Sequence, residues 1–315
     1  MQALQTLTWN DTWYLAPEIV LAAFTIALAL LDLSLPRRID RDIIGWGAVL
    51  GLVTAGVFVG WHIHDLGAWE KAGESPFRNL LDGSYRVDDF GNLLKLVFLG
   101  ASALIVLASL GTVKKEEVPI KGEFYYLVLP AVLGAMVMAS SGDLITLFIG
   151  MELLGITSYI LVGVRKSSGL SGEAAFKYVV TGGTASAFVL YGMSFLYGAT
   201  GSTRLSGIAQ SIGDAVEGSK ALVYVAFFLM IVGFALKLAL APFHAWAPDV
   251  YQGAPTPVTS FLGVVAKAAA FAMLYRLFVN TALYAYADTA QVREDLFLAL
   301  AVLAAAAMIV GVAGA

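Results

Sequence analysis

The stretch 143–164, DLITLFIGMELLGITSYILVGV, constrains this chain most, because it is long and apolar enough to cross a membrane but carries an acid in its middle. Glu152 lies nine residues from its start and twelve from its end, near the expected bilayer midplane. A charge at that depth costs a few kcal/mol and usually marks an ion or proton path. Gly155 and Tyr159 follow Glu152 on the same helical face. We predict a membrane helix with a functional carboxylate; the alternative is a glutamate that only hydrogen-bonds a neighbouring helix.

Composition extends this prediction to the whole chain. Of the 315 residues, 59% are hydrophobic and 13% charged, and the mean hydropathy is +0.80. Soluble domains contain about a quarter charged residues. Runs of apolar residues this long predict an all-α, polytopic transmembrane helix bundle, whereas a barrel would show short alternating strands.

The charge balance and the residue types missing from the chain exclude several kinds of site. A net charge of −4 argues against a nucleic-acid partner. With no cysteine, disulfides, thiolate zinc sites and cysteine-ligated Fe–S clusters are excluded. The three histidines are too few and too scattered for a metal site. We therefore expect no metal and no cofactor to be bound by this chain.

Basic residues suggest how the chain crosses the bilayer. They recur in the loops after the first, third and fifth hydrophobic spans, which predicts cytoplasmic loops there and an N-terminus outside. The N-terminal residues lack the basic segment of a cleaved signal, so the first span is expected to remain. We predict one membrane domain, 1–315, with nine spans at about 14–35, 43–61, 90–111, 124–140, 143–164, 174–197, 221–250, 255–279 and 296–315.

The seventh span is too long for a straight helix. Its 30 residues would reach about 45 Å, more than the roughly 30 Å of a hydrocarbon core. Pro242 inside it removes a backbone hydrogen bond. A broken helix is predicted between about Lys237 and His244, with both side chains available to handle protons. The alternative is a proline kink with a lysine bonded to stray carbonyls.

A polar stripe marks the sixth span. Lys177, Thr181 and Thr184 recur at helical spacing. Because Lys177 lies near one end of the span, a lysine that merely extends its ammonium to the membrane surface explains it equally well. The residues alone leave both interpretations open.

The eighth span carries a second stripe. Thr256, Ser260 and Lys267 fall on one face of a continuous helix, and Lys267 lies about twelve residues from each end. That depth is too great for its ammonium to reach the surface easily. Lys267 is therefore expected either to pair with an acid or to exchange a proton.

Four runs together carry a family resemblance: 17–33, 140–163, 173–192 and 234–271, the last reading FALKLALAPFHAWAPDVYQGAPTPVTSFLGVVAKAAAF. They resemble the antiporter-like, proton-translocating membrane subunits of bacterial NADH-quinone oxidoreductase (respiratory complex I), and the first run most resembles the N-type member. The resemblance implies a proton path through Glu152, Lys177, Lys237 and Lys267, driven by redox chemistry on other subunits. The candidate relays beside it are His244, Thr181, Thr184, Thr256 and Ser260.

The resemblance also implies a setting for the chain. It implies a bacterial plasma membrane, other complex I membrane subunits and a peripheral redox arm as partners, with NADH, FMN, Fe–S clusters and quinone bound on those partners. Family members have about fourteen helices, so a chain with nine spans is expected to be truncated. Two other functions stay open. One is a subunit of a multi-subunit cation/proton antiporter, and the other is a truncated, non-conducting scaffold.

Overall fold

The computed structural model describes residues 9–36, 38–71, 73, 75, 77–113, 118, 120–281 and 290–313. Within these residues, nine helices are long and apolar enough to cross a membrane, which confirms the all-α polytopic bundle. The elements in chain order are α1 (Trp9–Tyr14), α2 (Ala16–Ser34), α3 (Asp42–Lys71), β1 (Phe77–Leu80), η1 (Leu81–Gly83), β2 (Tyr85–Asp88), α4 (Asp89–Ser109), α5 (Lys121–Ser140), α6 (Leu144–Val162), α7 (Gly169–Thr200), α8 (Leu205–Leu238), α9 (Trp246–Gly253), α10 (Thr256–Phe261), the π-helical turn η2 (Leu262–Ala266), α11 (Lys267–Asn280) and α12 (Ala290–Ala313).

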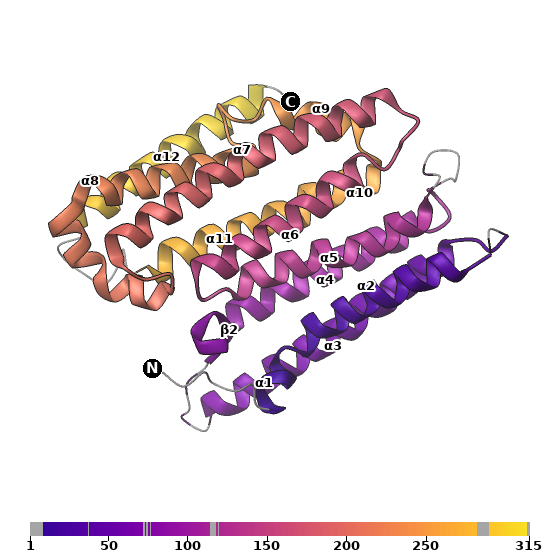
Figure 1. Cartoon of the computed structure of the whole chain (residues 1–315), viewed down its shortest axis with the longest axis horizontal. Helices are drawn as coiled ribbons and strands as arrows, with labels where there is room; N and C mark the ends of the chain where they lie inside the picture. Colours follow the sequence, from indigo (N-terminus) through magenta and orange to yellow (C-terminus); the bar gives the residue numbers. More distant parts are fainter. Residues whose placement is uncertain are drawn as a thin grey trace.

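The long helices lie side by side in a slab, from α2 and α3 at one edge to α8 and α12 at the other (Figure 1). Helix α5 lies in the interior, since 67% of its span is buried, against 6% for α12. Helices α5 and α6 pack closely because a Cβ on Gly134 would lie 2.6 Å from the backbone nitrogen of Leu154. This contact brings the backbone of α6, which carries Glu152, against the interior helix.

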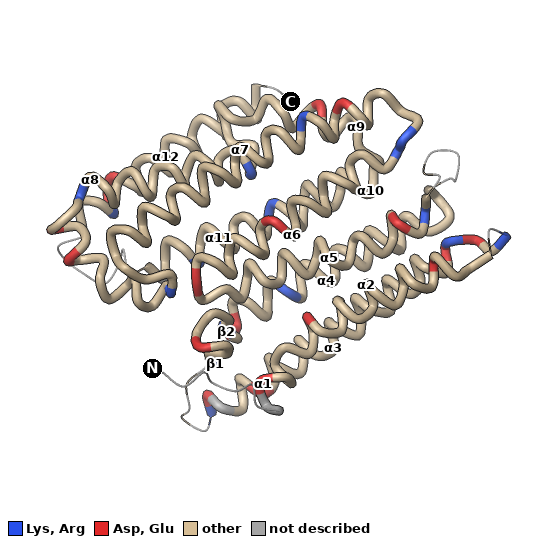
Figure 2. Tube along the Cα trace, viewed as in Figure 1, with Lys and Arg blue, Asp and Glu red and all other residues tan. Residues whose placement is uncertain are grey.

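The two ends of the bundle differ. At the hairpin end, β1 and β2 pair antiparallel, and the N–H of Gly142 donates to the carbonyl of Ser84 over 2.8 Å. We call the other end, which carries residues 38–41, 110–113 and 163–168, the opposite end. Charged residues gather at both ends and are sparse along the helix middles (Figure 2). This distribution is expected of helices that cross a hydrocarbon layer.

Several predicted boundaries were wrong. Helix α3 continues to Lys71 rather than 61, α7 covers 169–200 rather than 174–197, and α8 begins at Leu205 rather than 221. A search for apolar runs finds only the hydrocarbon part of a helix, whereas backbone hydrogen bonds continue into polar turns. Ser219 (φ −148°, ψ 47°) bends α8 just before its apolar part, where the prediction began.

Two further elements were not predicted. The β-hairpin at 77–88 was assigned to a loop, because its strands are four residues long and polar. The eighth span was predicted as one regular helix, but the π-helical turn η2 interrupts it between α10 and α11. Such turns insert one extra residue into a helix and are frequent at functional sites.

Candidate functional site

The chain leaves helical geometry between α8 and α9, around Pro242. Helix α8 ends at Leu238, and Ala239 adopts a left-handed conformation (φ 56°, ψ 43°) that costs a non-glycine residue about 1–2 kcal/mol. Helix α9 resumes at Trp246. The non-helical segment 239–245 therefore places the end of a helix beside Lys237, and the carbonyls of Ala235 and Leu236 in its last turn accept from the N–H groups of Leu240 and Ala239.

The level of this break follows from its neighbour α7, which packs against both α8 and α9. A Cβ on Gly233 would lie 2.7 Å from the carbonyl oxygen of Ala185, and one on Gly253 would lie 2.5 Å from that of Leu170. Helices α8 and α9 thus form two halves of one crossing alongside α7. Lys237 lies near the middle of that crossing.

Trp246 fixes the geometry of the break. Its indole N–H donates to the carbonyl of Leu236 over 2.9 Å, in the last turn of α8. Its ring stacks on Tyr178 with 5.1 Å between centroids, and Tyr178 meets the edge of Tyr159 at 4.8 Å. One side chain therefore satisfies a helix-end carbonyl and ties the break to α7 and α6.

Glu152 and Lys237 face each other at this level. The Ser186 hydroxyl donates to Oε1 of Glu152, and the Nζ of Lys237 lies 3.8 Å from the same oxygen. The side chains of Lys237 and Glu152 are 15% and 27% exposed. A charge-assisted hydrogen bond is usually about 2.7–2.9 Å. The pair is therefore close enough for strong attraction, but it is not closed by a direct hydrogen bond.

A small cavity of ≈ 40 Å³ adjoins Lys237. A water needs about 10–15 Å³ by this measure, so the cavity has room for two or three. The buried Tyr159 hydroxyl, which lines the cavity, has no hydrogen-bond partner among the described residues. Thr181 and Gly182 line one side, and Ala266 and Ala270 line the other. The cavity thus reaches from Lys237 to Ala266 and Ala270, which lie before and after Lys267 in the chain.

Lys267 begins α11, directly after the π-helical turn, and its Nζ lies 5.6 Å from the ring centroid of Tyr251. The extra residue of the π-turn rotates Lys267 by about 100° relative to Thr256 and Ser260, since one residue occupies that angle in an α-helix. The predicted single stripe is therefore broken. Its lysine and its hydroxyls face different surroundings.

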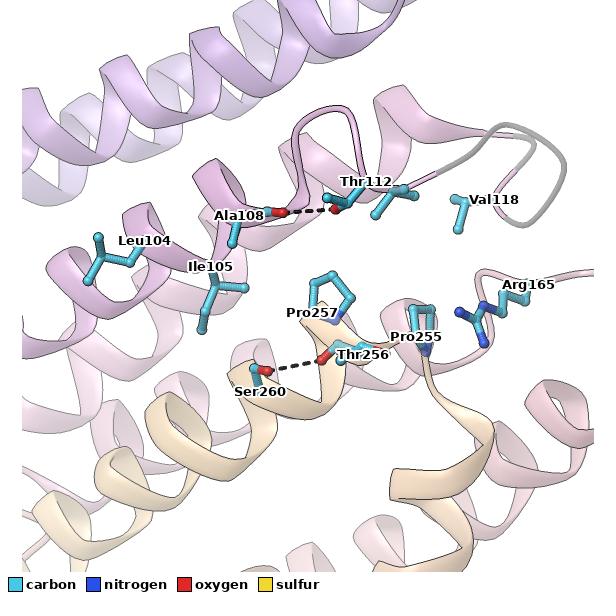
Figure 3. A pocket seen from close by; sticks show the side chains of 11 residues that line it. Leu104, Ile105, Ala108, Thr112, Val118, Arg165, Pro255, Thr256, Pro257 and Ser260 are labelled. Atoms are coloured by element: carbon cyan, nitrogen blue, oxygen red, sulfur yellow. Dashed lines mark hydrogen bonds between the residues drawn. The ribbon is translucent and has the colours of Figure 1, made fainter.

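Thr256 and Ser260 line a separate cavity of ≈ 460 Å³ near the opposite end, together with Arg165 and Thr112 (Figure 3). The Ser260 hydroxyl donates to the carbonyl of Thr256 in its own helix. The structure does not bring these two hydroxyls to Lys237.

The remaining candidates from the sequence, Lys177, Thr184 and His244, form no hydrogen bond or ion pair with Glu152 among the residues that the structure describes. Lys177 is 38% exposed and pairs with Asp249 at 2.5 Å and Glu173 at 2.6 Å, away from Glu152. Thr184 is exposed and bonds its own helix. His244 is half-buried in the break, and its Nδ1 has no partner within the described ranges. Among the candidates, Glu152, Lys237 and Thr181 therefore adjoin one site, and Ala266, the neighbour of Lys267 in the chain, lines its cavity.

Ser186 was missed by the sequence analysis. It lies in the small-residue run GGTASA, where nothing distinguishes the hydroxyl that faces Glu152 from the neighbouring ones. The described part of the chain contains no group of three or more histidines and acids that could hold a metal ion.

Comparisons with known proteins show the family of this chain. The family described as "NADH:quinone oxidoreductase/Mrp antiporter, TM" matches residues 141–315, more than half of the chain. The chain belongs to this family. The matched region contains the helix break around Pro242 and all four residues of the predicted proton path: Glu152, Lys177, Lys237 and Lys267.

Two individual relatives show which member of the family this chain resembles in sequence. NADH-quinone oxidoreductase subunit N of Paenibacillus sp. (strain JDR-2) is 54% identical over 98% of this chain and 61% of its own length. The protein of the same name from Brevibacillus brevis is 48% identical over 96% of this chain and 58% of its own. The chain thus spans about three fifths of these relatives.

Solved structures share the fold. A chain of respiratory complex I from Thermus thermophilus with bound aureothin is 36% identical, with a TM-score of 0.66 over 82% of this chain and 52% of that one. A chain of the Mrp complex from Dietzia sp. DQ12-45-1b is 20% identical, with a TM-score of 0.67 over 86% and 49%. At that identity the second likeness shows the fold alone.

Proposed function

We propose that this chain is an N-type membrane subunit of a proton-pumping NADH-quinone oxidoreductase, in which Glu152, Lys237 and Lys267 carry the proton. The observation that supports this most is the open ion pair of Lys237 and Glu152 beside a water-sized cavity at a helix break. A merely structural pair gains from closed, fully satisfied contacts, which this pair lacks.

The proposed step is a change in the charge that Glu152 presents to Lys237. At 3.8 Å and an effective dielectric constant of about 20, an ionised carboxylate stabilises the ammonium by about 4 kcal/mol. When a rearrangement withdraws or neutralises Glu152, Lys237 loses that stabilisation and releases its proton into the cavity. Lys267, whose chain neighbour Ala266 lines the cavity, receives the proton through water. Return of the Glu152 charge then favours uptake of the next proton by Lys237.

The direction of transport rests on the two ends of the bundle. Arg41, Lys121 and Arg165 lie at the opposite end, which we assign to the cytoplasm by the positive-inside rule. The hairpin end and the N-terminus are then outside the plasma membrane. Lys177, with Asp249 and Glu173, forms a charged cluster on the cytoplasmic side of the break and is proposed as the entry point.

The energy is proposed to come from partner subunits. Relatives at 54% and 48% identity are named as subunits of NADH-quinone oxidoreductase, so NADH, FMN, Fe–S clusters and quinone are assigned to a peripheral redox arm and its junction with the membrane. This chain then supplies only the proton path.

Affinity purification of the tagged protein from its own membranes in a mild detergent tests this function. We expect flavin and Fe–S subunits to co-purify, with NADH:quinone activity in the eluate. Co-purification with antiporter-like membrane subunits alone, together with sodium-dependent proton transport that needs no NADH, would assign the chain to the cation/proton antiporters instead.

A further inference from the structure

A second buried charge cluster lies at the hairpin end, outside the site described above. The Nζ of Lys95 on α4 is 3.0 Å from Oε1 of Glu18 on α2 and donates to the Tyr85 hydroxyl on β2 over 2.6 Å. That hydroxyl in turn donates to the same Oε1 over 2.5 Å. The side chain of Lys95 is completely buried, and Glu18 is 8% exposed. Three titratable side chains from three elements therefore meet around a single carboxylate oxygen.

The cluster leaves buried polar atoms unsatisfied. Glu18 uses one oxygen twice, while its Oε2 has no hydrogen-bond partner in the described ranges. The same holds for both amide atoms of Asn92, one turn before Lys95 on α4, and for Nδ1 of His62 on α3. Asn92 and His62 are both fully buried. Buried polar atoms without protein partners are usually satisfied by internal water.

His62 lies close to the cluster. Its ring is 5.2 Å from that of Tyr14, which packs in one apolar cluster with Tyr85. The charges of Lys95 and Glu18 both act on it. Its other ring nitrogen, Nε2, lies 3.2 Å from the carbonyl of Trp13, so Nδ1 is the atom free to meet water. The unsatisfied atoms thus belong to the charge cluster itself and to two buried residues near it, His62 and Asn92.

The contacts also define a proton relay. Lys95 donates to the Tyr85 oxygen while Tyr85 donates to Glu18. If the Lys95 proton moves to the Tyr85 oxygen as the Tyr85 proton moves to Glu18, the ion pair becomes a neutral amine and a neutral carboxylic acid. Tyr85 is a neutral phenol before and after, and no charge leaves the cluster. The acid can then give its proton to water, and the amine can accept another.

We propose that Glu18, Tyr85 and Lys95 form a second proton-exchange site, whose ligands are water and an exchangeable proton. It lies about 9 Å along α4 from the hairpin end, since Lys95 is six residues beyond the helix start. All three residues precede the region 141–315 matched by the family. Proton binding stands independently of the proposed function, but the use of that proton in pumping rests on it.

Other charged groups face the cluster and contribute to its field. Arg276 on α11 acts on Tyr85 and binds Asp88 at 2.5 Å, and Asp65 on α3 acts on His62. Burial, followed by the Glu18 charge, raises the pKa of Tyr85. The phenol therefore keeps its proton and passes it on rather than holding a negative charge.

Infrared spectroscopy of the purified complex tests proton binding directly. We expect a protonated-carboxyl band that changes with pH and shifts in D₂O, that is lost in Glu18→Gln and that persists in Glu152→Gln. Asp295→Asn is the matched control, because Asp295 on α12 also accepts a hydrogen bond from a tyrosine, Tyr224, but lies at the far edge of the bundle. Identical carboxyl spectra for Glu18→Gln and the parent at every pH would overturn the proposal.

Pumping measurements test use of the proton. Replacing both charged partners, as in Glu18→Gln/Lys95→Met, leaves no buried charge unpaired and should allow assembly. We expect this variant to pump less than half as many protons per NADH as Asp295→Asn. If it fails to assemble, Tyr85→Phe decides, because it keeps the ring and removes only the relay hydroxyl. Parental pumping in the deciding variant would exclude a role in transport. If the parent itself does not pump, the proposed function fails, while the infrared result still stands.

Discussion

Replacing Glu152 by glutamine is the perturbation that separates charge from shape at the site. The amide keeps the size of the side chain and an oxygen that can accept from Ser186, but it removes the charge that faces Lys237. At 3.8 Å and an effective dielectric constant of about 20, the lost attraction is about 4 kcal/mol. Because each 1.36 kcal/mol is a factor of ten, the protonation equilibrium of Lys237 is biased by about three powers of ten.

Such a bias should stop Lys237 from alternating between its two states. In inverted membrane vesicles, we expect Glu152→Gln to assemble normally but to acidify the lumen at less than about a tenth of the parental rate per NADH oxidised. Assembly is checked on native gels, NADH oxidation by absorbance and acidification with a pH-sensitive dye. Asp295→Asn serves as the control, since it removes a carboxylate that also accepts a hydroxyl hydrogen bond. Near-parental pumping by assembled Glu152→Gln would return Glu152 to a structural role.

Three further perturbations follow from the contacts. Gly182→Ala places a methyl group against the Tyr159 hydroxyl and should lower pumping, whereas Gly183→Ala, whose Cβ meets open space, should not; equal vesicle acidification by the two would contradict the role of the cavity. Lys237→Arg combined with Lys267→Arg should pump little worse than either single variant, because steps in series are non-additive, and fully additive losses would place the lysines on separate paths. Arg276→Met removes both guanidinium hydrogen bonds of the buried Asp88 and leaves its charge only the Arg86 ion pair at 3.0 Å, so it should cost about 1.5–3 kcal/mol in the thermal unfolding of the complex. Burial raises the pKa of Asp88, but the hydrogen bonds and positive charges around it, those of Arg276 first, together lower it by more, so the folded protein holds this pKa below its ordinary value. The stability that the pair contributes is therefore present above about pH 4 and is lost as the pH falls below it. The difference in stability between Arg276→Met and the parent should disappear in acid.

The site residues that could be predicted from sequence are those whose charge is conspicuous in apolar surroundings. Glu152 and Lys237 stand out because an acid and a lysine interrupt long hydrophobic runs. Lys95 meets the same criterion, because it is a lysine within the apolar run LLKLVF of the third span, so it could also be predicted from the sequence. Its partners Glu18 and Tyr85 could not be inferred, because only the packing of the hairpin on α2 and α4 brings them together.

Sequence periodicity could not predict where a helix departs from the regular α-helical repeat. Thr256, Ser260 and Lys267 share a face only in a regular α-helix, and the π-helical turn at 262–266 rotates the lysine away. Sequence also gives no sign that the Ser186 hydroxyl contacts Glu152, because a serine among small apolar residues is compatible with any helix contact. Sequence therefore points to charges at depth and does not point to the groups that line the space between them.

Lys237→Arg in the otherwise unchanged complex tests the central claim most directly. Arginine keeps the positive charge beside Glu152 but does not release its proton in a protein, so it separates a proton carrier from a structural cation. The measurement is protons moved per NADH by the purified complex in sealed liposomes, with native-gel assembly as the check on folding. We expect an assembled complex that oxidises NADH but moves few protons. Full pumping with arginine at position 237 would contradict the proton path proposed for this chain.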